Sequence, residues 1–268
     1  MKKPFFRKNV VFSLIIAIFF VQVLVGCNMQ GMHVATSEEY ILPHMELSEG
    51  NAVQDLYADS LLYTVNIFVL ENSVLSYIVS GVIISYDGII LTSIENAQAR
   101  DVQVKKVQVY ASFGGRYPTD CIYPLSFVAS DAETGLTLLR FSGEIYHRDA
   151  ENRKVKGVEY IPALCSADTE IGTRCYAVAD VDLLYTGITE IAPQITEGIV
   201  GYTAEKTFHF TAPVSYGGLG GCILDENGYC IGFIATNVYL NGEDQMAYYS
   251  SVVLETFRDE NISWKVVR

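Results

Sequence analysis

The chain has 268 residues, of which 50% are hydrophobic and 18% charged, so it is neither intrinsically disordered nor too short to bury a sizeable core. Its net charge of −13 disfavours nucleic acid and anionic lipid headgroups as partners, because like charges repel at long range. We expect one domain made of two sub-units.

The first 26 residues are organised like a secretory signal. The apolar stretch from Val10 to Val25 has the length of a signal h-region rather than of a full membrane span. It ends in "LVGC", Leu24 to Cys27, which resembles a bacterial lipobox and implies cleavage before Cys27 and a lipid such as palmitate on that residue. The alternative is an ordinary signal anchor with a chance cysteine. A positive n-region precedes the apolar stretch and contains Lys2, Lys3, Arg7 and Lys8.

Removal of this signal changes the charge balance of the chain. It leaves 14 Lys and Arg against 31 Asp and Glu, which gives the mature chain a net charge of −17. Electrostatic attraction to an anionic bilayer is then absent, so the fatty chains must hold the protein at the membrane. We therefore expect a lipoprotein on the extracytoplasmic face of a bacterial membrane.

Residues 27–50 are predicted to be a tether, because they are polar and acidic and show little periodicity. The folded domain is expected at residues 51–268. It begins with one short amphipathic helix from Ala52 to Leu62, in which Val53, Leu56, Tyr57 and Leu61 recur at helical spacing.

Short runs rich in β-branched and aromatic residues then follow, separated by Gly, Asp and Asn turns. The tripeptides "YDG" and "ENG" each lie between two apolar runs, as hairpin turns do. Ten or more strands at this spacing indicate an all-β barrel or sandwich. The runs are residues 62–70, 75–93, 107–113, 121–130, 136–141, 173–180, 196–203, 207–213, 221–225 and 229–238.

The polar stretch from Gly143 to Lys156 is the expected joint between the two β sub-units. The first sub-unit would then span about residues 51–148 and the second about residues 155–268. Near the end of the chain, Ser251 is predicted to cap a helix that carries Val252, Val253, Leu254 and Phe257.

The cysteines that follow Cys27 are odd in number, so they cannot all pair internally, and none has the spacing of a metal site. If the "DENG" turn closes a hairpin between Leu224 and Tyr229, Cys230 faces Ile223 and Cys222 lies on the opposite face. A disulfide between these two is therefore not expected, and buried apolar thiols are the default. The five residues are Cys121, Cys165, Cys175, Cys222 and Cys230.

Four stretches, in order, resemble motifs of trypsin-like serine proteases of the HtrA/Deg type. The resemblance covers roughly Ala52 to Glu260 and implies two six-stranded β-barrels with short N- and C-terminal helices. A shared fold does not by itself establish the chemistry. The stretches are "SGVIISYDGIILTSIENAQ", "ASDAETGLTLLRF", "TEGIVG" and "YGGLGGCILDENGYCIGF".

The chemistry of that family requires an attacking serine, a histidine that takes its proton and an aspartate that orients the histidine. The resemblance places these positions at Leu219, Glu95 and Gly135, so all three are replaced. The four histidines, Ser93, Ser215 and Cys222 are interpreted as structural and do not supply a substitute. The loop that would shape the oxyanion hole keeps its glycines, Gly217, Gly218, Gly220 and Gly221.

The favoured interpretation is a membrane-anchored pseudoprotease that holds a peptide or protein in the former substrate cleft. The resemblance places the walls of its specificity pocket at Val200–Val214 and Tyr229–Val238. A second hypothesis is an enzyme of the serine endopeptidase family with a displaced catalytic set, which requires acid, base and nucleophile within about 3 Å of one another. A third is a structural envelope lipoprotein that binds its partner away from the cleft.

No metal or cofactor is expected from the sequence. No PDZ-like segment is evident after the predicted barrels, and family members without one are often monomers, so we expect a monomer.

Overall fold

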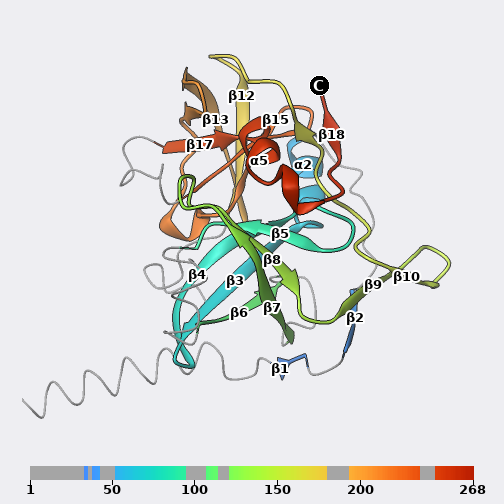
Figure 1. The fold of residues 1–268 in the computed structure, drawn as a ribbon. Helices are drawn as coiled ribbons and strands as arrows, with labels where there is room; N and C mark the ends of the chain where they lie inside the picture. Colours follow the sequence, from blue (N-terminus) through green and yellow to red (C-terminus); the bar gives the residue numbers. More distant parts are fainter. Residues whose placement is uncertain are drawn as a thin grey trace, which may run out of the picture. The chain divides into compact units, whose positions relative to one another are not determined.

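The computed structural model describes residues 33–35, 38–42, 52–94, 107–113, 121–179, 193–235 and 245–268. Most of its strands belong to two closed antiparallel barrels of six strands each (Figure 1). The predicted all-β class with a double barrel is therefore confirmed. Cys27, the rest of the signal region and Glu95 lie outside the described residues.

The first barrel has the strand order β7-β6-β3-β4-β5-β8, and pairing of β7 with β8 closes it. Strand β3 pairs with β4 on one side, where Ile67 faces Val79, and with β6 on the other, where Ile67 faces Ala111. All three side chains are buried, as expected where small and branched residues fill the interior of a narrow barrel. The strands are β3 (Thr64–Glu71), β4 (Val74–Ile83), β5 (Ile89–Thr92), β6 (Val107–Ser112), β7 (Cys121–Ser130) and β8 (Thr137–Phe141).

The second barrel has the order β15-β12-β13-β14-β17-β16, and pairing of β15 with β16 closes it. Two further short strands, β11 (Leu164–Cys165) and β18 (Val266–Val267), extend this sheet beyond β16 in parallel. The barrel strands are β12 (Arg174–Ala179), β13 (Gln194–Thr203), β14 (Thr207–Phe210), β15 (Cys222–Asp225), β16 (Cys230–Phe233) and β17 (Gln245–Tyr249). Strand β17 was not among the strands predicted from the sequence.

The β15–β16 hairpin corrects one prediction. Its turn lies where "DENG" predicted it, but Leu224 pairs with Cys230 and Ile223 with Gly232, because a bulge shifts the register. Cys222 and Leu224 are two residues apart on one strand, so Cys222 and Cys230 share a face. The prediction that they lie on opposite faces was wrong.

A three-stranded sheet in the order β10-β9-β2 replaces the predicted joint. It consists of β9 (Glu144–Arg148), β10 (Lys154–Lys156) and β2 (Glu39–Leu42), which pairs with β9 in parallel. Tyr40 and Leu42 on β2 are buried, and Glu39 forms an ion pair with Lys154. Part of the predicted tether therefore belongs to the folded domain. A two-residue strand, β1 (His33–Val34), precedes it.

Two short helices lie where they were predicted. α2 (Ala52–Ser60) precedes β3, and α5 (Ser250–Thr256) follows β17. Ser251 does not cap α5, because the helix begins one residue earlier and the Ser251 hydroxyl bonds Asp168 instead. Two 3₁₀ turns, η1 (Tyr216–Gly218) and η2 (Arg258–Glu260), complete the elements. No helix within the described ranges is long and apolar enough to span a bilayer.

Candidate functional site

Residues Gly217–Gly221, called the glycine loop below, connect η1 to β15, and all five are buried. Main-chain hydrogen bonds fix their path. The Gly218 N–H donates to the Ser215 carbonyl at 2.9 Å, and the Gly221 N–H donates to the Gly218 carbonyl at 2.9 Å. The Gly220 N–H donates to the Ile234 carbonyl at 2.8 Å, so the loop is also joined to the residue that follows β16.

Only glycine suits position 220. Its φ of +82° lies in the left-handed region, which side chains with a Cβ rarely adopt. A Cβ there would overlap the Ser80 carbonyl oxygen and lie 2.6 Å from the Thr92 hydroxyl oxygen. The loop therefore packs directly against β4 and β5 of the first barrel, with no room for a side chain between them.

Leu219 occupies the predicted nucleophile position, and its side chain is only 1% exposed. Its carbonyl accepts a hydrogen bond from the Ser80 N–H at 2.8 Å, and the Ser80 hydroxyl donates to the Gly217 carbonyl at 3.0 Å. An alkyl side chain buried in the core can neither attack a carbonyl nor move a proton. In this protein the glycine loop packs Leu219 into the core and bonds the second barrel to Ser80 of the first.

Gly135 occupies the predicted aspartate position and has a φ of +72° in a tight turn. The Asp131 carboxylate accepts bonds from the Thr134 N–H at 2.7 Å and the Thr134 hydroxyl at 2.8 Å. The Ser93 hydroxyl donates to the Gly135 carbonyl at 2.9 Å. This turn is thus held by its own polar groups and by Ser93, two residues before Glu95 in the sequence.

Two histidine side chains are described, and both make structural contacts. His147 on β9 is 9% exposed, with Nδ1 2.9 Å from the Gly157 carbonyl oxygen. His209 on β14 packs edge-on against Tyr202, with ring centroids 5.3 Å apart. Neither contact involves a serine or cysteine.

Cys222 is the strong nucleophile nearest the loop in sequence. Its thiol is fully buried and forms no disulfide, and the same is true of the Cys230 thiol. A hydrogen bond with Cys230, together with burial, raises the pKa of the Cys222 thiol well above its ordinary value. The thiol is therefore protonated near neutral pH, which suits a core residue and not a nucleophile.

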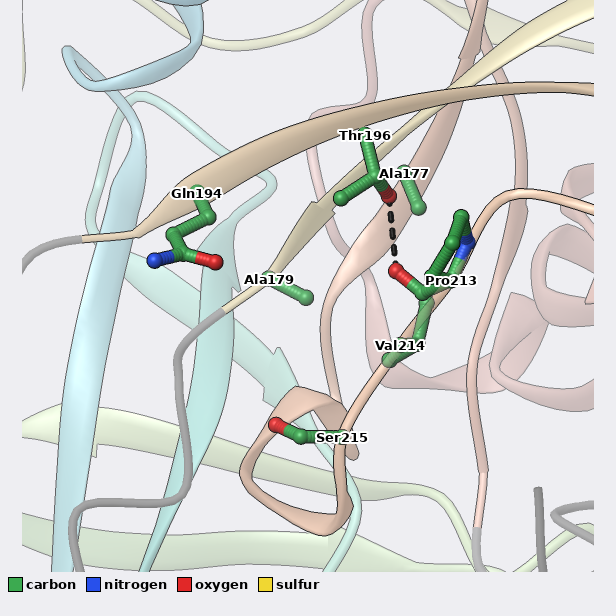
Figure 2. Close-up of a pocket in the computed structure, with 7 residues that line it drawn as sticks. All are labelled: Ala177, Ala179, Gln194, Thr196, Pro213, Val214 and Ser215. Atoms are coloured by element: carbon green, nitrogen blue, oxygen red, sulfur yellow. Dashed lines mark hydrogen bonds between the residues drawn. The ribbon is translucent and has the colours of Figure 1, made fainter. Parts of the chain in front are cut away.

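A cavity of about 310 Å³ lies beside the glycine loop (Figure 2). One side is formed by β12 and β13, whose register pairs Ala177 with Thr196 and Ala179 with Gln194. The other side is the segment Pro213–Ser215, which leads into η1. We call this cavity the β12 pocket. Its lining residues are Ala177, Ala179, Gln194, Thr196, Pro213, Val214 and Ser215.

The β12 pocket differs from the predicted specificity pocket. It shares Pro213 and Val214 with the expected wall Val200–Val214, but β12, β13 and Ser215 supply the rest of its described lining. The segment Pro213–Ser215 is held by β13 and β17, because Thr196 Oγ1 donates to the Pro213 carbonyl at 2.8 Å and Gln245 Nε2 donates to the Val214 carbonyl at 3.4 Å. Residues 236–238 of the other expected wall lie outside the described residues.

The comparisons with known proteins agree with this architecture. Residues 79–233 match the family described as "Trypsin-like peptidase domain", which is more than half of the chain. The chain belongs to this family. A solved structure titled "Crystal structure of Deg5" resembles it with a TM-score of 0.59 and 18% sequence identity, over 79% of this chain and 95% of that one. The predicted HtrA/Deg-type trypsin-like fold is confirmed. A search of curated proteins finds no match.

The described residues contain no group of three or more His, Cys, Asp or Glu side chains that could hold a metal ion. The β12 pocket was missed by sequence reasoning. Its one local signal is a pair of alanines at alternate positions of β12, and small residues in a strand do not by themselves indicate a cavity.

Proposed function

We propose that this member of the trypsin-like peptidase family is catalytically inactive and acts, outside the cytoplasm and anchored by Cys27, as a peptide- or protein-binding module. The observation that carries the proposal is Leu219. Its side chain is buried at the position where the family resemblance expects the nucleophile, and its carbonyl is bonded to Ser80. A buried alkyl side chain in that arrangement offers no reactive atom.

A binding role is supported by the preservation of the loop without its reactive group. Five buried residues, among them the crowded left-handed Gly220, still form the turn between the barrels. Peptide recognition by added-strand pairing uses main-chain hydrogen bonds, which require no catalytic triad. Loss of the triad and retention of a peptide groove are therefore compatible.

The proposed inactivity is tested with detergent-solubilised full-length protein, a fluorophosphonate serine-hydrolase probe and a casein degradation assay. We expect no labelling and intact casein, alongside a trypsin control that labels and cleaves. The variant Leu219→Ser should also stay unlabelled, because Glu95 and not a histidine stands at the expected base position. Specific labelling of one serine in the native protein would show that a displaced catalytic set exists.

The binding role needs a separate experiment. A library of peptides is panned against the full-length protein in detergent, and bound sequences are measured by fluorescence anisotropy. We expect enrichment of a common motif that binds the folded protein and not the urea-unfolded one. Lack of any enriched motif would contradict the proposed peptide role.

The proposed anchor is tested at the N-terminus. Mass spectrometry of the membrane-extracted protein should find residues 1–26 removed and fatty acyl groups on Cys27. The variant Cys27→Ala should lack the lipid and retain the signal sequence. An acyl-free Cys27 inside an uncleaved chain would instead favour the ordinary signal anchor.

A further inference from the structure

The β12 pocket lies on the β12–β13 side of Pro213–Ser215 and shares only Pro213 and Val214 with the walls of the proposed peptide cleft. We infer that it is a second binding site, which takes a neutral, mainly apolar group with an adjoining amide. A leucine or phenylalanine side chain next to a peptide bond has this chemistry. The inference goes beyond the proposed function, because Ala177, Ala179, Gln194 and Thr196 are not part of those walls.

The pocket is hollow because short side chains meet a segment that is held in place. Ala177 and Ala179 contribute only methyl groups from β12. The opposing segment cannot close onto them without breaking the bond from Thr196 to the Pro213 carbonyl or the bond from Gln245 to the Val214 carbonyl. The volume of about 310 Å³ lies at the lower end of the range for small-molecule sites, and it exceeds what one or two waters need.

The lining selects against charge. The part of the lining that the structure describes consists of alanine, valine and proline together with uncharged polar groups, and none of these described residues ionises. A charged group in this pocket would lose water without gaining an ionic partner, which is unfavourable. The acidic chain, with 31 Asp and Glu against 18 Lys and Arg, further disfavours anions.

The polar residues of the lining suit an amide. Gln194, whose side chain is exposed at the pocket, offers both a carbonyl oxygen and an NH₂ group. The Thr196 hydroxyl donates to Pro213, which leaves its oxygen lone pairs able to accept a bond. Methyl groups for a hydrocarbon and hydrogen-bonding groups for one amide therefore lie in the same cavity.

An occupant would lie close to the glycine loop. A Cβ at Gly221 would lie 2.9 Å from the Ala179 methyl carbon, and one at Gly218 would lie 3.1 Å from it. The same methyl group thus contacts the pocket on one side and the loop on the other. Binding should consequently perturb the amide signals of Gly218 and Gly221 as well as the pocket methyl groups.

The test is an NMR titration of full-length protein in detergent, labelled with ¹³C in alanine and valine methyl groups and with ¹⁵N in glycine. The probes are N-acetyl-L-leucinamide and N-acetyl-L-phenylalaninamide, with N-acetyl-L-lysinamide and N-acetyl-L-glutamate amide as charged counterparts. We expect the neutral probes to shift the methyl signals of Ala177, Ala179 and Val214 and the charged ones to shift them at least tenfold less at equal concentration. A second arm uses Ac-Gly-Leu-Gly-NH₂. Shifts at the same methyl groups would assign the occupant to a residue within a peptide, whereas shifts by the single amides alone would assign it to a small molecule.

Three variants complete the design. Ala177→Val fills the pocket and should weaken binding of the leucine probe about tenfold or more. Gln194→Ala alters an exposed side chain that does not threaten folding, and should weaken binding about threefold through loss of one hydrogen bond. Gly201→Ala adds a methyl group to β13, the strand of Gln194, at a Cβ position with no atom within 4 Å. This control variant should leave binding unchanged.

The inference is overturned if the pocket methyl signals do not respond, if the charged probes shift them equally, or if Ala177→Val and Gly201→Ala bind alike. Enriched peptides that bind while these methyl signals stay still would retain the proposed cleft function and reject the β12 pocket. Shifts of the pocket methyl signals without any enriched peptide would support the β12 pocket and contradict the proposed peptide function.

Discussion

The glycine loop and the segment Pro213–Ser215 are neighbours in the sequence, yet their surroundings are opposite. Every residue of the loop is buried, and its backbone bonds both barrels. The segment Pro213–Ser215 borders a cavity, and its residues are partly or fully exposed. The glycine loop is therefore closely packed between the barrels, whereas Ser215, two residues before Gly217, borders unfilled space.

This difference shows where the site tolerates change. In a close-packed interior, every added or removed methyl group changes the stability, whereas a cavity can accept an added methyl group without strain. We therefore expect substitutions in the loop to alter the stability of the whole domain. Substitutions that line the β12 pocket should mainly alter binding.

The largest effect is expected from Gly220→Ala. The new methyl group would force a residue with a Cβ into a left-handed conformation and against the Ser80 carbonyl, a combined cost of about 3–5 kcal/mol of unfolding free energy. Urea unfolding followed by fluorescence of the single tryptophan, Trp264, measures it.

Gly172→Ala is the matched control, because Gly172 has a similar φ of +89° but nothing within 4 Å of its Cβ position. This variant should lose only the cost of placing a residue with a Cβ in the left-handed conformation, about 1–2 kcal/mol of unfolding free energy. Equal losses at the two positions would mean that the loop is not crowded against the first barrel.

Leu219→Ala should have the next largest effect. Truncation of a fully buried leucine typically lowers the free energy of unfolding by about 2–5 kcal/mol, since apolar contacts are lost and a cavity remains. Ile171→Ala removes a side chain that is 62% exposed and should change stability by less than about 0.5 kcal/mol. A similarly small effect at Leu219 would place its side chain in solvent and weaken the case against a displaced active site.

The sequence predicted the loop but not the pocket, for a physical reason. Glycines at tight turns and alternating apolar residues are local signals, and they predicted an all-β barrel or sandwich and the two hairpin turns. The double barrel and the glycine loop were predicted from the family resemblance. The β12 pocket depends on which residues face Ala177 and Ala179 across the fold, and that information is not local. The sheet formed by β9, β10 and β2 was missed likewise, because polar β9 is completed by a strand from the predicted tether about 100 residues earlier.

Ser80→Ala tests the side-chain part of the connection between loop and barrel. It removes the hydroxyl that bonds the Gly217 carbonyl and leaves the main-chain bond to Leu219 in place. We expect a loss of about 1–2 kcal/mol, because a buried carbonyl loses its donor. Ser142→Ala, which breaks an exposed hydroxyl pair with Ser126, should cost almost nothing. Equal effects of the two variants in urea unfolding would show that main-chain contacts alone hold the loop.

The smallest effect concerns Cys175, which lies on β12 two residues before Ala177 and therefore on the same face. The Cys175 side chain is fully buried, and burial raises the pKa of its thiol to about 12, against an ordinary value of 9.0. The β12 pocket should therefore end before this residue. A raised native pKa stabilises the fold fully below pH 9, and the stabilisation is lost as the pH rises toward 12, since the unfolded chain releases its proton first. Native protein should therefore lose about 1 kcal/mol more than Cys175→Ala between pH 8 and pH 10. Other groups with raised pKa values are present in both proteins and cancel in the difference. Parallel pH profiles would mean that water reaches the thiol, which would extend the pocket along β12 and remove the sharp boundary between its hollow and packed ends.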